Sequence, residues 1–161
     1  MAYIITNGPA GCQPIATTST VKNHPLGKIV TAVDPTLGEG EFIYLQGIGS
    51  TVVGSWVTWN VASGVTALLA GNAIGAVAVA MSANVASQYG WYQLSGNAVA
   101  KAADVADSGK VYIDTAAGVC DDAPVTGDRV NNAKWISDDA TTGLASVYIS
   151  RPFVTDQKDA T

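Results

Sequence analysis

The sequence predicts an all-β fold: a sandwich or barrel, jelly-roll-like, of about eight to ten short antiparallel strands behind an extended N-terminal arm. Two observations lead to this prediction. From residue 26 onward, short runs rich in Val, Ile, Thr, Tyr and Trp recur roughly once per 12 residues, separated by Gly, Asn, Asp and Pro. Helix signals are poor, because β-branched residues and glycines interrupt every longer window.

The predicted arm covers residues 1–25. Pro9, Pro14 and Pro25 lie in it, and no hydrophobic period of either kind is sustained. Because proline lacks a backbone donor, such a segment can lie along a surface but does not easily enter a central sheet. We therefore expect the arm to contribute little to the core of a β-domain over residues 26–154, and we expect a flexible C-terminal tail over 155–161.

Ten segments are candidate strands, in order along the chain. They are KIVTAV (28–33), EFIYLQGI (41–48), SWVTWNV (55–61), VTALL (65–69), IGAVAVAM (74–81), YGWYQLSG (89–96), NAVAKAA (97–103), KVYIDT (110–115), DRVNNAKWI (128–136) and LASVYIS (144–150).

The alternation of side chains assigns faces in some of these segments. In 74–81 alanines alternate with Val77, Val79 and Met81, a period of two that fits a strand. In 110–115 and 144–150 the aliphatic residues share one face, which leaves Tyr112 and Tyr148 on the opposite face. We therefore expect aliphatic side chains in the core and tyrosines outside it.

The segment EFIYLQ is apolar on both faces. Phe42 and Tyr44 alternate with Ile43 and Leu45, so neither face is suited to water. A strand of this kind must be covered twice, either by two layers of one domain or by one layer and a partner chain.

The composition limits the classes of function. The chain is 48% hydrophobic and 13% charged, about half the charged fraction of roughly 25% in ordinary domains. An extensive core, oligomer interfaces or burial of the surface within a larger assembly would each explain this low charged fraction. The net charge is −5 and the eight basic residues are scattered, so direct nucleic-acid binding is not expected. The apolar stretch 65–86 is interrupted by Gly, Ser and Asn, and the N-terminus has no secretion-signal pattern.

Candidate catalytic and metal-binding residues are few. His24 is the single histidine and no nucleophile motif accompanies it, so we expect an arm residue rather than a catalyst. Cys12 and Cys120 are far apart without ligand spacing; free thiols are favoured, and a disulfide stays open. Glu39 and Glu41 share a face if extended and could form an acid/base pair, although an exposed turn is favoured.

Loop aspartates could bind calcium through their carboxylate oxygens, but they lack EF-hand spacing and solvated turns are favoured. They are Asp121, Asp122 and Asp128 in one loop, and Asp138 and Asp139 in another. The residues therefore predict no enzyme, no cofactor and no metal site.

An aromatic cluster, Tyr89, Trp91 and Tyr92, has three interpretations: a sugar-stacking platform, a core plug, or a surface covered by another chain. Gly90 could add a bulge that changes which rings share a face. We favour core packing of Trp91 with a tyrosine exposed at an interface.

The segments PLGKIVTAVDPTLGEGEFIYLQGIGSTVVGSWVTWN, IGAVAVAMSANVASQYGWYQLSGNAVAKAA and GLASVYISRPFV resemble small head proteins of tailed bacteriophages, and more specifically decoration, or cement, proteins. The resemblance covers about residues 25–154. It implies a β-rich virion structural protein without an enzyme site, made in the bacterial host cytoplasm, that binds the major capsid protein on the outer capsid surface. The hydrophobic, charge-poor composition suggests in addition a homo-oligomer, a dimer or trimer, and the interrupted apolar stretch 65–86 suggests no membrane partner.

The expected contact residues are the aromatic and apolar side chains of the arm and of the strands. They are Tyr3, Ile4, Ile5, Phe42, Tyr44, Tyr89, Trp91, Tyr112 and Tyr148. The alternative function is a virion-surface carbohydrate- or receptor-binding module, in which exposed aromatics stack on glycans.

Overall fold

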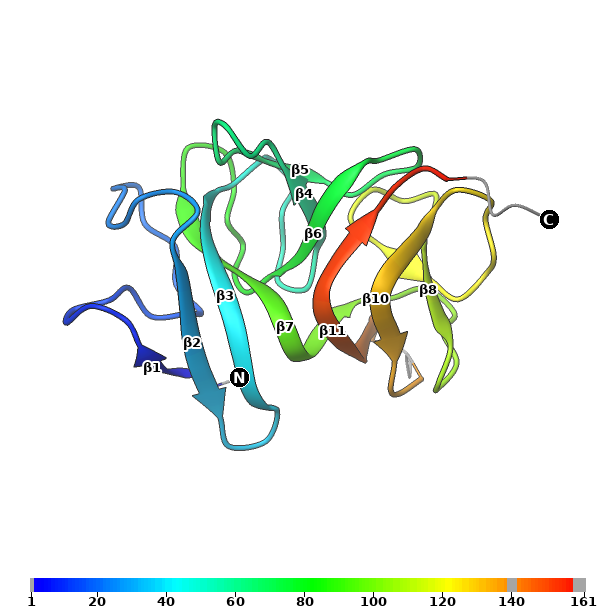
Figure 1. The fold of residues 1–161 in the computed structure, drawn as a ribbon, viewed down its shortest axis with the longest axis horizontal. Coiled ribbons are helices and arrows are strands. Elements are labelled where there is room, and N and C mark those ends of the chain that lie inside the picture. Colours follow the sequence, from blue (N-terminus) through cyan, green and yellow to red (C-terminus); the bar gives the residue numbers. More distant parts are fainter. Residues whose placement is uncertain (1, 139–141, 158–161) are drawn as a thin grey trace.

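The computed structural model describes residues 2–138 and 142–157, and in this part of the chain eleven strands form one antiparallel sheet that does not close, with no helix (Figure 1). The predicted all-β class is confirmed. Asp139 and residues 158–161 of the expected tail lie outside the described residues. The strands are β1 (Ile4–Asn7), β2 (Ile29–Asp34), β3 (Gly38–Gln46), β4 (Trp56–Trp59), β5 (Thr66–Leu68), β6 (Gly75–Ala80), β7 (Tyr89–Lys101), β8 (Lys110–Ile113), β9 (Cys120–Asp121), β10 (Arg129–Trp135) and β11 (Leu144–Val154).

All ten candidate segments contain a strand, but two of them are one strand. Segments 89–96 and 97–103 form the continuous β7, which bends at Gly96 with a φ of 95°. The sequence pattern did not predict β1 or β9, which have 4 and 2 residues. Strands this short carry too few alternations to give a period of two.

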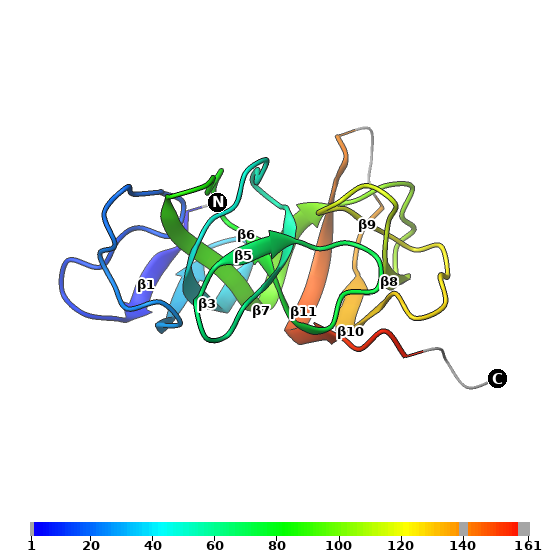
Figure 2. The same cartoon turned by 90° about the horizontal axis from the view of Figure 1, so that it is seen from above.

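Strand β7 joins the two halves of the sheet. The strand order is β1-β2-β3-β7-β6-β11-β10-β8-β9, with β4 beside β6 and β5 beside β4. The first half of β7 pairs with β3, and its second half pairs with β11. In Figures 1 and 2 the N-terminal strands therefore lie on one side of β7 and the C-terminal strands on the other.

Strand β3 is covered on both faces by layers of its own chain. Phe42 and Tyr44 belong to a cluster on the arm side of the sheet, and Ile43 and Leu45 belong to a cluster shared with β4 and β6. A third cluster fills the C-terminal half beneath β8, β10 and β11. The doubly apolar strand could be covered either by two layers of one domain or by one layer and a partner chain. The structure shows the first arrangement.

The N-terminal arm is part of the core, so the expectation that it contributes little is wrong. Strand β1 pairs with β2, and Ile15 is 1% exposed in the arm-side cluster. Gln13 accepts a hydrogen bond at its backbone carbonyl from the indole Nε1 of Trp91 at 2.8 Å. The prolines lie in turns of the arm, and those turns place apolar residues over the sheet.

The tyrosine faces were predicted correctly in one strand and wrongly in another. Tyr148 is 51% exposed, whereas Val147 and Ile149 are buried, as the alternation indicates. Tyr112 is 5% exposed because β8 is covered on both faces, with three consecutive residues buried. Alternation alone does not say whether a second layer covers the outer face.

Candidate functional site

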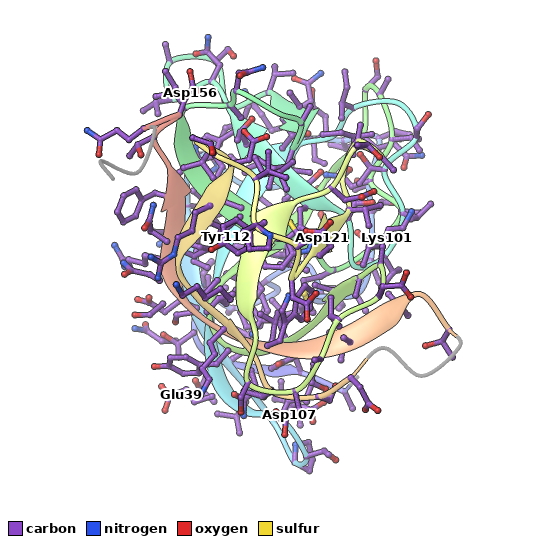
Figure 3. The ribbon with its side chains drawn as sticks, turned by 90° about the vertical axis from the view of Figure 1, so that its right-hand side faces the viewer. Glu39, Lys101, Asp107, Tyr112, Asp121 and Asp156 are labelled. Carbon is purple, nitrogen blue, oxygen red and sulfur yellow. The ribbon has the colours of Figure 1, made fainter. Side chains whose placement is uncertain are left out.

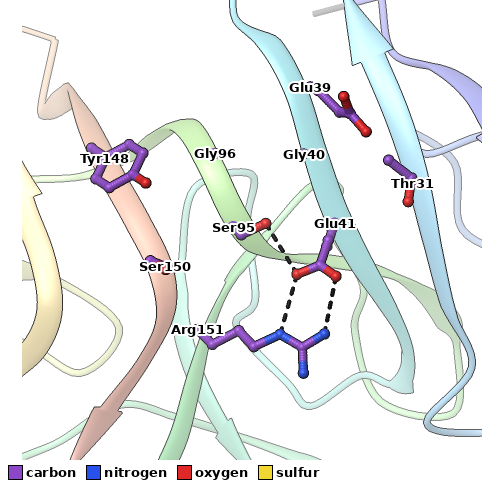
Figure 4. Close-up of a pocket in the computed structure, with 9 residues that line it drawn as sticks. All are labelled: Thr31, Glu39, Gly40, Glu41, Ser95, Gly96, Tyr148, Ser150 and Arg151. Atoms are coloured by element: carbon purple, nitrogen blue, oxygen red, sulfur yellow. Dashed lines mark hydrogen bonds and ion pairs between the residues drawn. The ribbon is translucent and has the colours of Figure 1, made fainter.

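A groove of about 500 Å³ opens where β3 and β11 separate on either side of β7 (Figure 4). Strand β3 supplies Glu39 and Glu41, and β11 supplies Tyr148 and Arg151. The bend of β7 forms the floor between them. The groove combines charged, hydroxyl and aromatic groups, so it is the candidate site.

The floor depends on two glycines and a buried amide. Gly96 adopts a positive φ, and a Cβ added to it would collide with the carbonyl oxygen of Glu39; a Cβ on Gly40 would lie 2.8 Å from the carbonyl oxygen of Ser95. Gln93, which is fully buried, donates from Nε2 to the carbonyl oxygens of Ser95 and Asn97, each at 3.0 Å. This amide therefore holds both sides of the bend.

An ion pair spans the groove between β3 and β11. Arg151 donates from Nη2 to Glu41 Oε1 at 3.0 Å and from Nε to Oε2 at 3.2 Å, and Ser95 Oγ also donates to Oε2 at 3.2 Å. Arg151 has a φ of 48°. It lies where β11 leaves β7, after Ser150, and begins to pair with β6 at Phe153.

The ion pair disfavours the general-acid role considered for Glu41. The hydrogen bond from Arg151 lowers the pKa of Glu41, and the positive charge of Arg151 and the hydroxyl of Ser95 add to this effect. Glu41 therefore stays ionised near neutral pH and does not act as a general acid. Its neighbour Glu39 is exposed.

Four of the predicted contact residues are core residues, and their prediction as contacts is corrected. Phe42, Tyr44 and Trp91 are 0% exposed, and Tyr112 is 5% exposed. Phe42, Tyr44 and Trp91 fill the arm-side cluster, which leaves no ring surface for a partner.

The other predicted contact residues have some access to solvent. Ile4 is 69% exposed and Tyr148 is 51% exposed. Tyr3, Ile5 and Tyr89 are half-buried against the arm-side cluster. Of all nine, only Tyr148 lies in the groove.

The aromatic cluster of β7 is a core plug rather than a sugar platform. Trp91 packs at 5.0 Å from the ring of Tyr44, and Tyr92 is buried on the other face, where its hydroxyl accepts a hydrogen bond from Asn84 Nδ2 at 2.9 Å. Gly90 lies in regular register opposite Leu45, so it introduces no bulge. The irregularity lies at Glu41 and Phe42, opposite residues 93–95.

His24 and Cys12 have structural positions in the arm. His24 packs against Tyr44 at 5.0 Å, and its Nε2 accepts a hydrogen bond from the Gln13 backbone N–H at 3.1 Å. Burial raises the pKa of the Cys12 thiol, which disfavours the reactive thiolate. Cys12 and Cys120 are both free, which settles the open question of a disulfide.

Two of the loop aspartates accept hydrogen bonds from backbone N–H groups of other loops. Asp128 Oδ1 accepts a hydrogen bond from the backbone N–H of Asn72, and Asp122 Oδ2 accepts one from that of Ala106, each at 2.9 Å. Burial, with the negative charge of Asp114, raises the pKa of Asp121, which lies opposite Tyr112 in the register (Figure 3). Within residues 2–138 and 142–157 no group of three or more His, Cys, Asp or Glu side chains could hold a metal ion.

The groove was not predicted as a unit. Ser95, Gly96, Ser150 and Arg151 come together only through the bend of β7 and the departure of β11 from it. The local signals were a glycine inside an alternating strand and an Arg-Pro step in the last strand, both typical of bulges or bends.

No family model, curated protein or solved structure matches the chain. Among the described residues, no helix has the length and apolar character needed to cross a membrane.

Proposed function

We propose that this protein is a decoration protein of a tailed-phage head, which binds the outer surface of the major capsid protein lattice and stabilises the mature shell. Two supports lead to this proposal. The first is the resemblance of residues 25–154 to such proteins, and the second is the open edge of the sheet at β1.

The observation that carries the proposal is the exposed edge strand β1. Among the described strands it pairs only with β2, so one row of its backbone groups is left for another chain. The strand IITN contains no charge and no proline, two of the devices that block edge pairing, although it has only 4 residues and its register shifts between Ile5 and Asn7. Ile4 is 69% exposed and lies opposite Val33, which is 38% exposed, so the edge also presents an apolar face.

An edge of this kind suits a protein that holds neighbouring capsid subunits together. A strand from a capsid subunit or from a second copy of this chain can extend the sheet at β1, with Ile4 and Val33 packed beneath it. Because the lattice offers many equivalent positions, copies that also contact one another gain effective concentration. A protein that binds only the assembled shell stabilises that state by mass action.

The experiment is co-sedimentation of the purified protein with mature heads and, in parallel, with free capsid subunits. We expect saturable binding to heads and none to free subunits. Ile4→Lys should weaken attachment at least tenfold, because it places a charge on the apolar edge. Ile74→Lys is the matched control, since Ile74 is 73% exposed in the loop before β6, and it should bind as the wild type does.

Two results would contradict the proposal. One is the absence of the protein from purified virions together with no binding to heads. The other is equal loss of attachment in Ile4→Lys and Ile74→Lys, which would place the contact away from the β1 edge.

A further inference from the structure

We infer that the groove between β3 and β11 binds an uncharged saccharide. This activity goes beyond the proposed capsid attachment, which uses the β1 edge. The inference rests on the shape of the groove, on its fixed polar groups and on the exposed ring of Tyr148.

The shape fits a small ring-shaped ligand. The volume of about 500 Å³ lies within the range of roughly 300–1,000 Å³ for small-molecule sites. Gly40 and Gly96 line the floor, and their missing side chains let the backbones of β3 and β7 approach each other closely there. The groove remains open at the surface, as a site for a chain-like ligand requires.

The polar groups are fixed before any ligand arrives. Glu41 is held by two hydrogen bonds from Arg151 and one from Ser95, so its carboxylate and the guanidinium keep one geometry. The hydroxyls of Ser95 and Ser150 can both donate and accept hydrogen bonds. Sugar hydroxyls also do both, and they match a surface on which donors and acceptors lie side by side.

The charge balance selects an uncharged sugar. Glu41 and Arg151 neutralise each other, which leaves the exposed carboxylate of Glu39 as the net charge of the groove lining. An acidic sugar or a phosphate would be repelled by it. A basic peptide would use only this single carboxylate and would leave the paired groups unused.

Tyr148 supplies the apolar contact. It is half-exposed on the β11 wall, opposite Asn97 of β7 and Lys134 of β10 in the register. An exposed tyrosine presents a flat apolar ring with a polar hydroxyl at its tip. The C–H face of a sugar ring can pack on this ring while the sugar hydroxyls reach Ser150 and the ion pair.

The test is saturation-transfer NMR of the full-length protein with neutral hexasaccharides of glucose, galactose and N-acetylglucosamine. A galacturonic acid hexamer and a hexalysine peptide are measured in parallel. We expect transfer to at least one neutral hexasaccharide and weaker transfer to the acidic hexamer. Tyr148→Ala should weaken that binding about tenfold. Tyr148→Phe should retain most of the binding because it keeps the ring.

Phe153→Ala is the matched control, because Phe153 is an exposed aromatic residue on the same strand outside the groove. It should bind as the wild type does. Glu39→Gln should leave binding of the neutral hexasaccharide unchanged. It should strengthen binding of the acidic hexamer, because it removes the repelling carboxylate. Thermal unfolding of each variant verifies that the fold is intact.

Three outcomes would overturn the inference: no transfer to any neutral hexasaccharide, transfer unaffected by Tyr148→Ala, or binding of hexalysine or of the acidic hexamer alone. Capsid co-sedimentation is independent of this readout, so failure of the saccharide site is distinguishable from failure of the proposed function.

Discussion

Replacement of Gln13 by alanine should destabilise the whole β-domain, because its amide ties the arm to the sheet. Gln13 is 7% exposed, and its side chain makes four hydrogen bonds. Its Oε1 accepts from Tyr44 Oη at 2.8 Å and from Asn23 Nδ2 at 2.9 Å, and its Nε2 donates to the carbonyl oxygens of Thr17 at 2.8 Å and Tyr89 at 3.1 Å.

The expected magnitude follows from these bonds. A net contribution of roughly 0.5–1.5 kcal/mol per bond, together with the cost of leaving the buried Tyr44 hydroxyl without this partner, gives a loss of about 3–5 kcal/mol. The assay is urea unfolding. With a slope of roughly 2 kcal/mol per molar urea, the midpoint should fall by about 1.5–2.5 M.

Gln88→Ala is the matched control. Gln88 is a half-buried glutamine beside β7, and its side chain makes no hydrogen bond with the described residues, so its replacement should change the free energy of unfolding by less than about 0.5 kcal/mol. In a double-mutant cycle with Tyr44→Phe, the two changes should be non-additive by about 1 kcal/mol. A midpoint shift below about 0.5 M for Gln13→Ala would show that the hydrogen bonds of Gln13 contribute little to stability and that the arm is only weakly attached to the sheet.

Three further predictions concern the groove and the thiols. Arg151→Met should lower the free energy of unfolding only slightly at pH 7 in urea unfolding, because an exposed ion pair contributes little; because the pKa of Glu41 is lowered from its usual 4.5, this difference should shrink as the pH falls through that lowered value, and persistence at pH 2 would contradict it. Gly96→Ala should cost about 2 kcal/mol or more in thermal unfolding, whereas Gly49→Ala, which has open space around it, should be nearly neutral; equal effects would refute the role of the bend. The fully buried Cys120 should resist thiol reagents in the native state and react in denaturant, and fast native labelling would show that the C-terminal half opens.

The strands were predictable because runs rich in β-branched and aromatic residues recur between Gly, Asn, Asp and Pro. In segment 74–81 the period of two is between valine and alanine, both apolar: Val77 and Val79 face the C-terminal cluster, and Ala78 and Ala80 face the cluster shared with β3. The merging of 89–103 into one strand was not predictable, because Gly96 looks like a strand end and acts as a bend.

The partners of the doubly apolar strand could not be read from the sequence. The pattern of Phe42 and Ile43 required two covers, but periodicity does not say which segment provides them. The arm provides one of the two covers, through Ile15 and Gln13. The sequence did not indicate this, because the prolines of the arm prevent regular strand pairing but do not prevent burial. Without the arm as a cover, the pattern predicts contact surface at Phe42, Tyr44 and Trp91, and their burial beneath the arm corrects this prediction.

The shared strand β7 also shapes how the chain folds as it is made. Its first half pairs with β3, which is synthesised earlier, whereas its second half pairs with β11, which begins only at Leu144. Because these pairings are far apart in sequence, folding should be slow for a domain of this size. A nascent chain that has emerged through residue 101 therefore carries an unpaired edge until β11 has been synthesised, and we expect this intermediate to be prone to aggregation.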